Sequence, residues 1–194
     1  MSSYAARMVR HPVLHDRIAA GILDTAAAVL ADRSGETVSM AEIAEAAGVG
    51  RATLYRYFPN RDALISGLTR AAIDELCDRV ADADLGSAGA TTALTRLTRG
   101  FLTSGNKYVA LWSHGKRSAD IAEIDERLAE PVRGLMRRAV ADGTLRDDVP
   151  AAMQFEIYTA LLERGLDLLR RKEISVERGT ELIVTLFLDG ARRR

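Results

Sequence analysis

The spacing of apolar residues predicts helices along almost the whole chain. Between residues 15 and 32, apolar side chains recur every three or four positions, the period of one helix face. The same period predicts further helices at about 39–46, 50–58, 60–82, 91–105, 106–114, 119–142, 150–171 and 175–191. Because β-branched runs are few, we expect an all-α fold.

Prolines, glycines and one asparagine mark where these helices begin and end. Pro59 disfavours α geometry in the residue before it, and Asn60 is a good cap for the helix that follows. Pro131 should kink or break the helix that contains it, and Gly143 should end that helix. Pro150 suits the first turn of the next helix.

Two of the predicted helices are short and are joined by a tight turn containing two glycines. Ser39 and Glu42 have the spacing of a capping box, in which each side chain bonds the other's backbone amide. The segment AAGVG at 46–50 ends this helix after about eight residues. Two short helices with such a turn are typical of a helix-turn-helix unit.

The second of these short helices has a distinctive outer face. At 100° per residue, Leu54 and Phe58 share a face that can pack on the preceding helix. Ala52 and Arg56 then point away from that core. A small residue permits a close backbone approach and an arginine can bond guanine edges, so this face suits the major groove of double-stranded DNA.

Charge changes the picture locally rather than globally. The 194 residues contain 27 basic and 27 acidic side chains, so the formal net charge is zero and does not indicate a nucleic-acid partner. Within 48–61, however, Arg51, Arg56 and Arg61 occur without any acid. This patch indicates a polyanionic partner; the alternative is a solvated basic face with tyrosines that close a small core.

Composition also bears on the compartment. The single cysteine, Cys77, excludes an internal disulfide framework and fits a reducing cytosol. The N-terminal residues lack the apolar core of a signal peptide, and no apolar run approaches the ~18 residues of a membrane span. We expect a cytoplasmic protein that does not associate with membranes.

The last two predicted helices are apolar on more than one face. A helix that is apolar nearly all round is buried on nearly all sides. In a chain of this size the second buried side fits a partner subunit, and two helices from each chain would form a four-helix interface. We therefore expect a homodimer through the helices at 150–171 and 175–191; the alternative is two central helices of a monomer.

The sequence contains no recognisable catalytic, metal or cofactor motif. His11 and His15 are four residues apart, but Pro12 lies between them, and Cys77 has no histidine at usable spacing. We expect no enzyme activity, no metal and no cofactor, although an enzyme on an all-helical scaffold stays an alternative.

Residues 39–65, SMAEIAEAAGVGRATLYRYFPNRDALI, resemble the TetR/AcrR family of bacterial transcriptional regulators. The family pattern is a capping Ser or Thr, a run of the type IA..AGVS..TLY.YF..K..L, and a following helix. The resemblance implies an N-terminal three-helix DNA-binding domain, here residues 1–60, and a larger helical domain for ligand binding and dimerisation, here residues 61–194.

The resemblance also implies a DNA-binding surface. Its residues here are Ser39, Gly50, Arg51, Ala52, Thr53, Tyr55, Arg56, Tyr57 and Arg61. Arg56 and the residues at 51–53 would face the groove, while Ser39, Tyr55 and Tyr57 would contact phosphates. Two positions depart from the family pattern. Gly50 replaces the usual serine cap and removes a hydroxyl, and Arg61 replaces lysine at a phosphate-contacting helix start.

Ligand pockets of the family lie among the helices after the DNA-binding domain. Residues 105–118 bring together aromatic and polar side chains of the kind that line such pockets. We expect a pocket lined in part by Phe101, Tyr108, Trp112, His114 and Met136. For Trp112, an ordinary core position is the alternative.

These observations predict a homodimeric transcriptional repressor that a small, mostly apolar effector releases from a palindromic operator. A transcriptional activator and a ligand-independent regulator are the alternatives within the same class.

Overall fold

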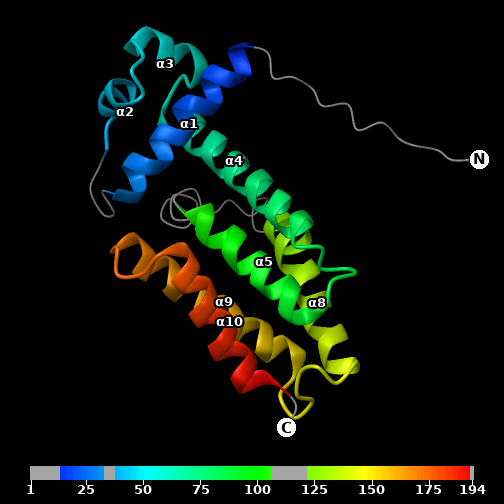
Figure 1. The fold of residues 1–194 in the computed structure, drawn as a ribbon. Helices are drawn as coiled ribbons and strands as arrows, with labels where there is room; N and C mark the ends of the chain where they lie inside the picture. The colour runs from blue at the N-terminus through cyan, green and yellow to red at the C-terminus, as the bar shows by residue number, and fades with distance from the viewer. Residues whose placement is uncertain (1–13, 33–37, 106–121, 193–194) are drawn as a thin grey trace, which may run out of the picture.

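The computed structural model describes residues 14–32, 38–105 and 122–192 (Figure 1). Its helices are α1 (Leu14–Asp32), α2 (Met40–Ala46), α3 (Arg51–Tyr57), α4 (Arg61–Asp82), α5 (Ala90–Thr103), η1 (Asp125–Ala129), α8 (Glu130–Ala141), α9 (Ala151–Arg170) and α10 (Val176–Ala191). These residues form no β-strand, only an isolated bridge between Leu145 and Arg192. The expected all-α fold is confirmed, while the predicted helix at 106–114 lies outside the described residues.

The buried side chains form two separate cores. The smaller core joins α1, α2, α3 and the first part of α4, and it includes Leu64 and Leu68, beyond residue 60. The larger core joins α5, α8, α9 and α10. Figure 1 shows α2 and α3 at the end of the molecule remote from the C-terminus, with α4 running from there toward the larger core. None of the helices described here is long and apolar enough to cross a membrane.

Local sequence signals position the helix-turn-helix unit. The predicted capping box is confirmed, because the Ser39 hydroxyl accepts from the Glu42 amide and the Glu42 carboxylate accepts from the Ser39 amide at 2.8 Å. At the other end of α2, Gly48 has a φ of +65°, a conformation that favours glycine. The amides of Gly48 and Val49 bond the Glu45 and Ala44 carbonyls, which is the Schellman arrangement.

A close packing contact fixes α3 on α4. Leu54 is fully buried and Phe58 nearly so, as predicted for the inner face of α3. A Cβ atom at Gly67 would lie 3.0 Å from Phe58 Cε1 and 3.3 Å from Leu23 Cδ2. Glycine therefore lets α4 lie directly against the Phe58 ring. The predicted Asn60 cap is confirmed, since its side chain accepts from the Ala63 amide at 2.8 Å and starts α4 one residue later.

The helix around Pro131 contains a π-helical turn. Residues Asp125–Ala129 adopt a π-helical turn, and the Glu130 amide bonds the Asp125 carbonyl five residues earlier. Proline has no amide hydrogen and its ring clashes with the carbonyl four residues before it, so the preceding turn must change its bonding. The predicted perturbation is thus present, but as a π turn that leads into α8. Gly143, with a φ of +77°, follows the end of α8 as expected.

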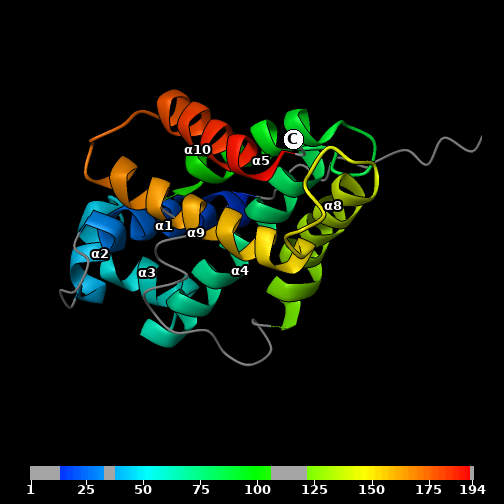
Figure 2. The ribbon, with the colours of Figure 1, turned by 90° about the horizontal axis from the view of Figure 1, so that it is seen from below.

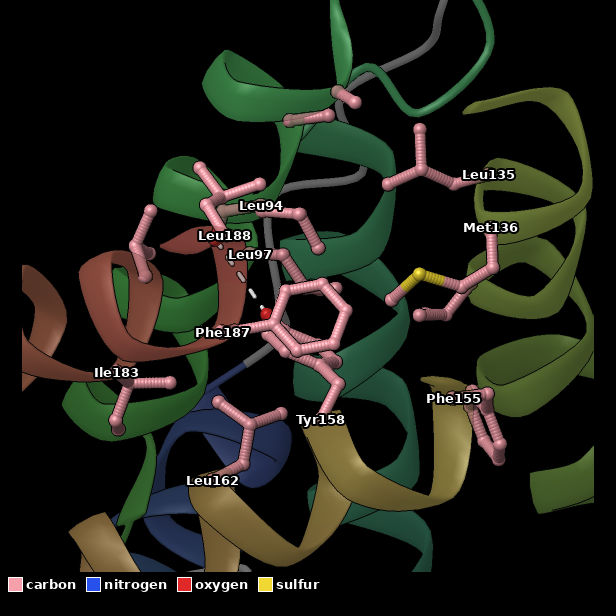
Figure 3. Packing of buried hydrophobic residues seen from close by; sticks show 14 of the residues in the cluster. Leu94, Leu97, Leu135, Met136, Phe155, Tyr158, Leu162, Ile183, Phe187 and Leu188 are labelled. Atoms are coloured by element: carbon pink, nitrogen blue, oxygen red, sulfur yellow. Dashed lines mark hydrogen bonds between the residues drawn. The ribbon is translucent and has the colours of Figure 1, made fainter. Parts of the chain in front are cut away.

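The larger core surrounds a buried tyrosine (Figure 3). Tyr158 of α9 is fully buried, and its ring lies 5.2 Å from that of Phe187 on α10. Its hydroxyl is 2.8 Å from the Thr98 hydroxyl and also reaches the Leu94 carbonyl of α5. Burial raises the pKa of Tyr158, so the phenol stays protonated and available for these hydrogen bonds.

We expect Tyr158→Phe to lower the free energy of unfolding by about 1–2 kcal/mol, because the buried Thr98 hydroxyl loses its partner. Urea denaturation at fixed protein concentration measures this change. In the double variant with Thr98→Val, both hydroxyls are gone, and the loss should be smaller than the sum of the two single losses. An additive double variant would show that the two hydroxyls do not interact.

Candidate nucleic-acid interface and cavity

The outer face of α3 presents the predicted surface residues to solvent. Arg51, Ala52 and Arg56 are exposed, and Tyr55 is 48% exposed, while Thr53 is half-buried. Gly50 is the N-cap of α3 and provides no side-chain cap bond. The small and basic residues therefore lie together on a helix whose opposite side is anchored by buried leucine and phenylalanine.

Arg56 and Tyr57 are in contact at the end of α3. The Arg56 guanidinium lies 5.3 Å from the centroid of the Tyr57 ring, a cation–π distance. Tyr57 itself is half-buried and packs against the smaller core. The ring thus limits the directions in which the arginine can extend, and part of the predicted surface is held in place before any partner binds.

Arg61 has an internal bond that the sequence did not predict. One of its guanidinium nitrogens donates to the Val38 carbonyl, in the segment just before α2. This bond ties the start of α4 to the start of the helix-turn-helix unit. Since a guanidinium has five N–H donors, this bond leaves other N–H groups of Arg61 for a partner.

Ser39 also has an internal role. Its hydroxyl donates to Glu42 Oε2 at 2.7 Å while accepting from the Glu42 amide at 3.3 Å. The hydroxyl proton is therefore used inside the capping box in this conformation. A phosphate contact by Ser39 requires that this proton turn away from Glu42.

A cavity of about 390 Å³ lies among α4, α5, the η1 region, α8 and α9. Its volume falls within the range of sites for small organic molecules. Its lining residues are Leu76, Arg79, Val80, Leu97, Phe101, Ile124, Leu128, Ala129, Val132, Arg133, Phe155, Glu156, Tyr158, Thr159, Leu162 and Glu163. Most of these side chains are apolar or aromatic.

The residues predicted to line a ligand pocket fall in three places. Phe101 lines this cavity. Met136 is fully buried in the larger core and is not among the lining residues. Tyr108, Trp112 and His114 lie outside the described residues. The wall formed by α4 and α9 was missed because its apolar positions repeat at the helical period and are read from sequence as ordinary core.

The charged residues of the cavity differ in their partners. Arg79 pairs with Glu75 at 3.7 Å and Asp82 at 3.9 Å. Arg133 pairs with Asp125 at 2.8 Å, and its guanidinium lies 4.7 Å from the centroid of the Phe155 ring. Both arginine charges are therefore balanced by carboxylates outside the lining.

The two glutamates of the cavity lining, Glu156 and Glu163, differ from these arginines in their ion pairing. Both are exposed on the flank of α9 that forms the rim of the cavity. Neither has an ion pair with any residue in the described part of the chain. Among the described residues, the rim of the cavity therefore has two carboxylates without an ion-pair partner.

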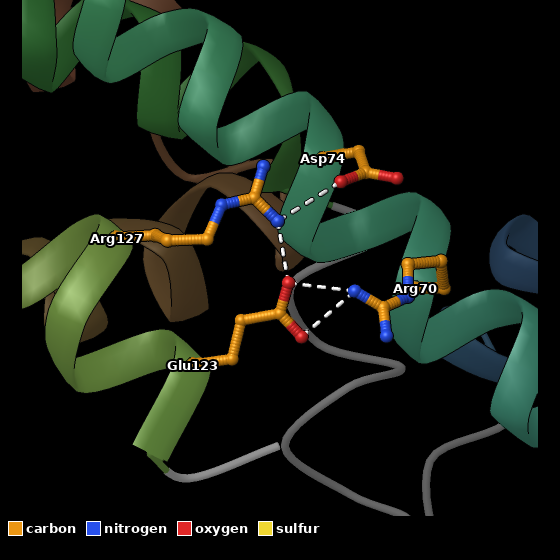
Figure 4. A network of polar contacts seen from close by, with 4 residues as sticks. All are labelled: Arg70, Asp74, Glu123 and Arg127. Atoms are coloured by element: carbon orange, nitrogen blue, oxygen red, sulfur yellow. Dashed lines mark hydrogen bonds and ion pairs between the residues drawn. The ribbon is translucent and has the colours of Figure 1, made fainter. Parts of the chain in front are cut away.

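An ion-pair network connects α4 to the segment around η1 on the opposite wall of the cavity (Figure 4). The Glu123 carboxylate accepts from Arg70 of α4 at 2.6 and 2.8 Å and also from Arg127. Arg127 in turn donates to Asp74 of α4 at 3.2 Å. Hydrogen bonding from Arg127, with the charge of Arg70, lowers the pKa of Glu123 below its ordinary value, so the carboxylate is ionised at neutral pH.

The residues of this network are direct sequence neighbours of residues that line the cavity. Ile124 and Leu128 line the cavity and directly follow Glu123 and Arg127. On the other side, α4 begins beside α3 and passes the Phe58 contact at Gly67. One continuous helix therefore contacts Phe58 at the end of α3 and also forms part of the cavity wall.

Comparison with known proteins relates this arrangement to one family. The model of the family described as bacterial regulatory proteins, tetR family, matches residues 22–68. The HTH-type transcriptional repressor LfrR of Mycolicibacterium smegmatis is 30% identical over 154 residues, which cover 78% of this chain and 79% of LfrR. The HTH-type transcriptional repressor KstR2 of Rhodococcus jostii is 23% identical, over 69% of this chain and 71% of KstR2.

Solved structures have the same fold. The structure of LfrR in complex with proflavine superposes with a TM-score of 0.74 and 26% identity, and it covers 92% of this chain and 99% of that one. PfmR of Thermus thermophilus, at 22% identity, has a TM-score of 0.69 and covers 94% of this chain and all of its own. With LfrR similar in sequence and in structure over most of both chains, this chain belongs to the TetR family of bacterial transcriptional regulators.

Proposed function

We propose that this protein is a homodimeric repressor that binds an inverted-repeat operator through α3 and leaves it when a small effector fills the α9-rimmed cavity. The observation that carries the proposal is the outer face of α3. Exposed Arg51 and Arg56 flank the small Ala52 there, on a helix anchored from below by Leu54 and Phe58. Such a face can approach the major groove closely and bond base edges, while nearby tyrosines and Arg61 reach phosphates.

Dimerisation through α9 and α10 is supported by apolar side chains left exposed there. Met153 and Ile157 of α9 are 54% and 47% exposed, and Leu186 of α10 is 63% exposed. Figure 2 shows α9 and α10 side by side on the same side of the molecule. A second copy packed on these exposed side chains would cover them and complete a four-helix bundle. Each α3 would then read one half-site, with half-sites about 34–36 Å apart.

Control by an effector is supported by the cavity and by its connection to α4. Proflavine, the ligand in the LfrR complex, is a sensible first probe for this chain. An effector that binds more tightly to a conformer with displaced α3 helices would weaken DNA binding. The size of this effect is limited by the difference in the effector's affinity for the two conformers. The Glu123 network would connect the cavity to α4, because it holds the η1 segment against that helix.

Selection from random DNA and footprinting upstream of the protein's own gene test operator binding. We expect Arg56→Ala to weaken operator binding by about 1–3 kcal/mol and to blur preference at one base position. Arg61→Ala should weaken binding to all sequences and lower the salt slope by about one unit. Absence of any selected site would contradict the proposal, and equal loss of specificity in both variants would contradict the separate roles.

We expect the double variant Ile157→Glu with Leu186→Glu to be monomeric, because two carboxylates per chain would have to be buried at the interface. Light scattering after size exclusion measures the mass. Ala20→Glu, on the exposed face of α1, is the matched control and should stay dimeric. If the double variant keeps the mass of two chains, the interface lies elsewhere.

We expect Glu123→Gln to reduce the effect of saturating proflavine on operator affinity by about fivefold. The neutral amide weakens both ion pairs and so loosens the η1 segment from α4. Glu126→Gln, on the same segment and exposed, loses the same charge without touching the network. Operator affinity is measured with and without saturating proflavine; an unchanged ratio in Glu123→Gln would exclude this link.

A further inference from the structure

We propose that the cavity selects organic cations, and that Glu156 and Glu163 are the residues that make this selection. The inference rests on the proposed effector site and specifies the chemical class of its ligand: a molecule with a flat or bulky apolar body and a positive charge.

The first step concerns the apolar body of the ligand. The cavity wall behind the rim is built mainly from leucine, valine and aromatic side chains, with Phe101 and Phe155 among them. At one end of this wall, the Arg133 guanidinium lies over the Phe155 ring. This face of the ring is therefore already covered by a cation. A ligand's apolar surface gains most by covering the remaining aliphatic and aromatic wall.

The second step concerns which charges are available to a ligand. An anionic ligand would need Arg79 or Arg133, but each is already paired with carboxylates: Arg79 with Glu75 and Asp82, and Arg133 with Asp125. An anion would have to displace those acids and would also approach two unbalanced glutamates. A cation meets the opposite situation, because Glu156 and Glu163 have no competing ion pair among the described residues.

The third step concerns geometry. Glu156 and Glu163 are seven residues apart on α9, so their backbones lie about 10 Å apart along the helix axis on one flank. Thr159 lies between them on the cavity side, and its hydroxyl donates to the Glu156 carbonyl at 3.0 Å. A ligand lying along this flank can place its charge near either carboxylate while its body covers the wall.

The glutamates remain in water until a ligand arrives, so they cost the empty protein no desolvation. For the same reason each provides only a modest attraction, and salt screens it. The apolar wall therefore supplies most of the affinity, and the two carboxylates supply the preference for positive charge.

The test compares two probes of nearly the same shape at pH 7.5: N-methylacridinium, a permanent cation, and acridine, which is neutral at this pH. We expect the cation to bind about tenfold more tightly in low salt and its advantage to shrink as salt is raised. In the double variant Glu156→Gln with Glu163→Gln, the cation should lose about tenfold in affinity while acridine keeps its own. Glu126→Gln, outside the cavity lining, should leave both affinities unchanged.

Equal affinity for the two probes, or a cation affinity unaffected in the double variant, would overturn the inference. Binding is measured by calorimetry on the full chain without DNA, so it does not depend on repression. Operator binding is measured separately in the same preparations. A protein that binds its operator but shows no cation preference disproves only this inference, and one that prefers cations but binds no DNA disproves only the proposed function.

Discussion

A seven-residue helix has no stability of its own in water, so the outer face of α3 keeps its shape only because α3 is anchored from beneath. Leu54 and Phe58 provide that anchor, and Phe58 can do so because Gly67 lets α4 come within contact of its ring. The orientation of Arg51 and Arg56 therefore depends on the packing of α3 against α2 and on the contact between Phe58 and α4.

Under the proposed function, the contact between Phe58 and Gly67 makes α4 the connection between the cavity and the outer face of α3. The helix is continuous over Arg61–Asp82, and Leu76, Arg79 and Val80 line the cavity near its far end. A rigid element that serves two sites can transmit a small displacement without any special chain of contacts between them. The π turn at Asp125–Ala129 adds a place on the opposite wall where the backbone bonding is already irregular, next to Pro131.

Much of this arrangement could be predicted from local sequence signals. The Ser39–Glu42 capping box, the Asn60 cap and the inner face of α3 follow from spacings within one helical turn, and the structure confirms each of them. The bond from Arg61 to the Val38 carbonyl could not be predicted, because it joins residues 23 apart whose proximity is a result of folding. The kind of perturbation before Pro131 could not be predicted either, since a kink and a π turn both relieve the missing amide.

The cavity shows the limit of sequence pattern most clearly. Helical periodicity separates buried positions from exposed ones, but it does not predict where the packed helices leave a cavity between them. Met136 and Phe101 look alike in the pattern, yet Met136 fills the larger core and Phe101 borders open space. Glu156 and Glu163 look like ordinary solvated residues of α9, and the role proposed for them follows only from the cavity beside them and the ion pairs of the two arginines.

The link between the cavity and α4 consists of exposed or half-exposed ion pairs, and this suits a switch. Such pairs contribute little to stability, and a coupling of ligand and DNA binding typically requires only about 1–3 kcal/mol. Separating a deeply buried ion pair would leave uncompensated buried charges, which costs more than a coupling of this size supplies. Because the Glu123 carboxylate is ionised and shared by Arg70 and Arg127, the link is intact in the free protein and still weak enough for a ligand to rearrange.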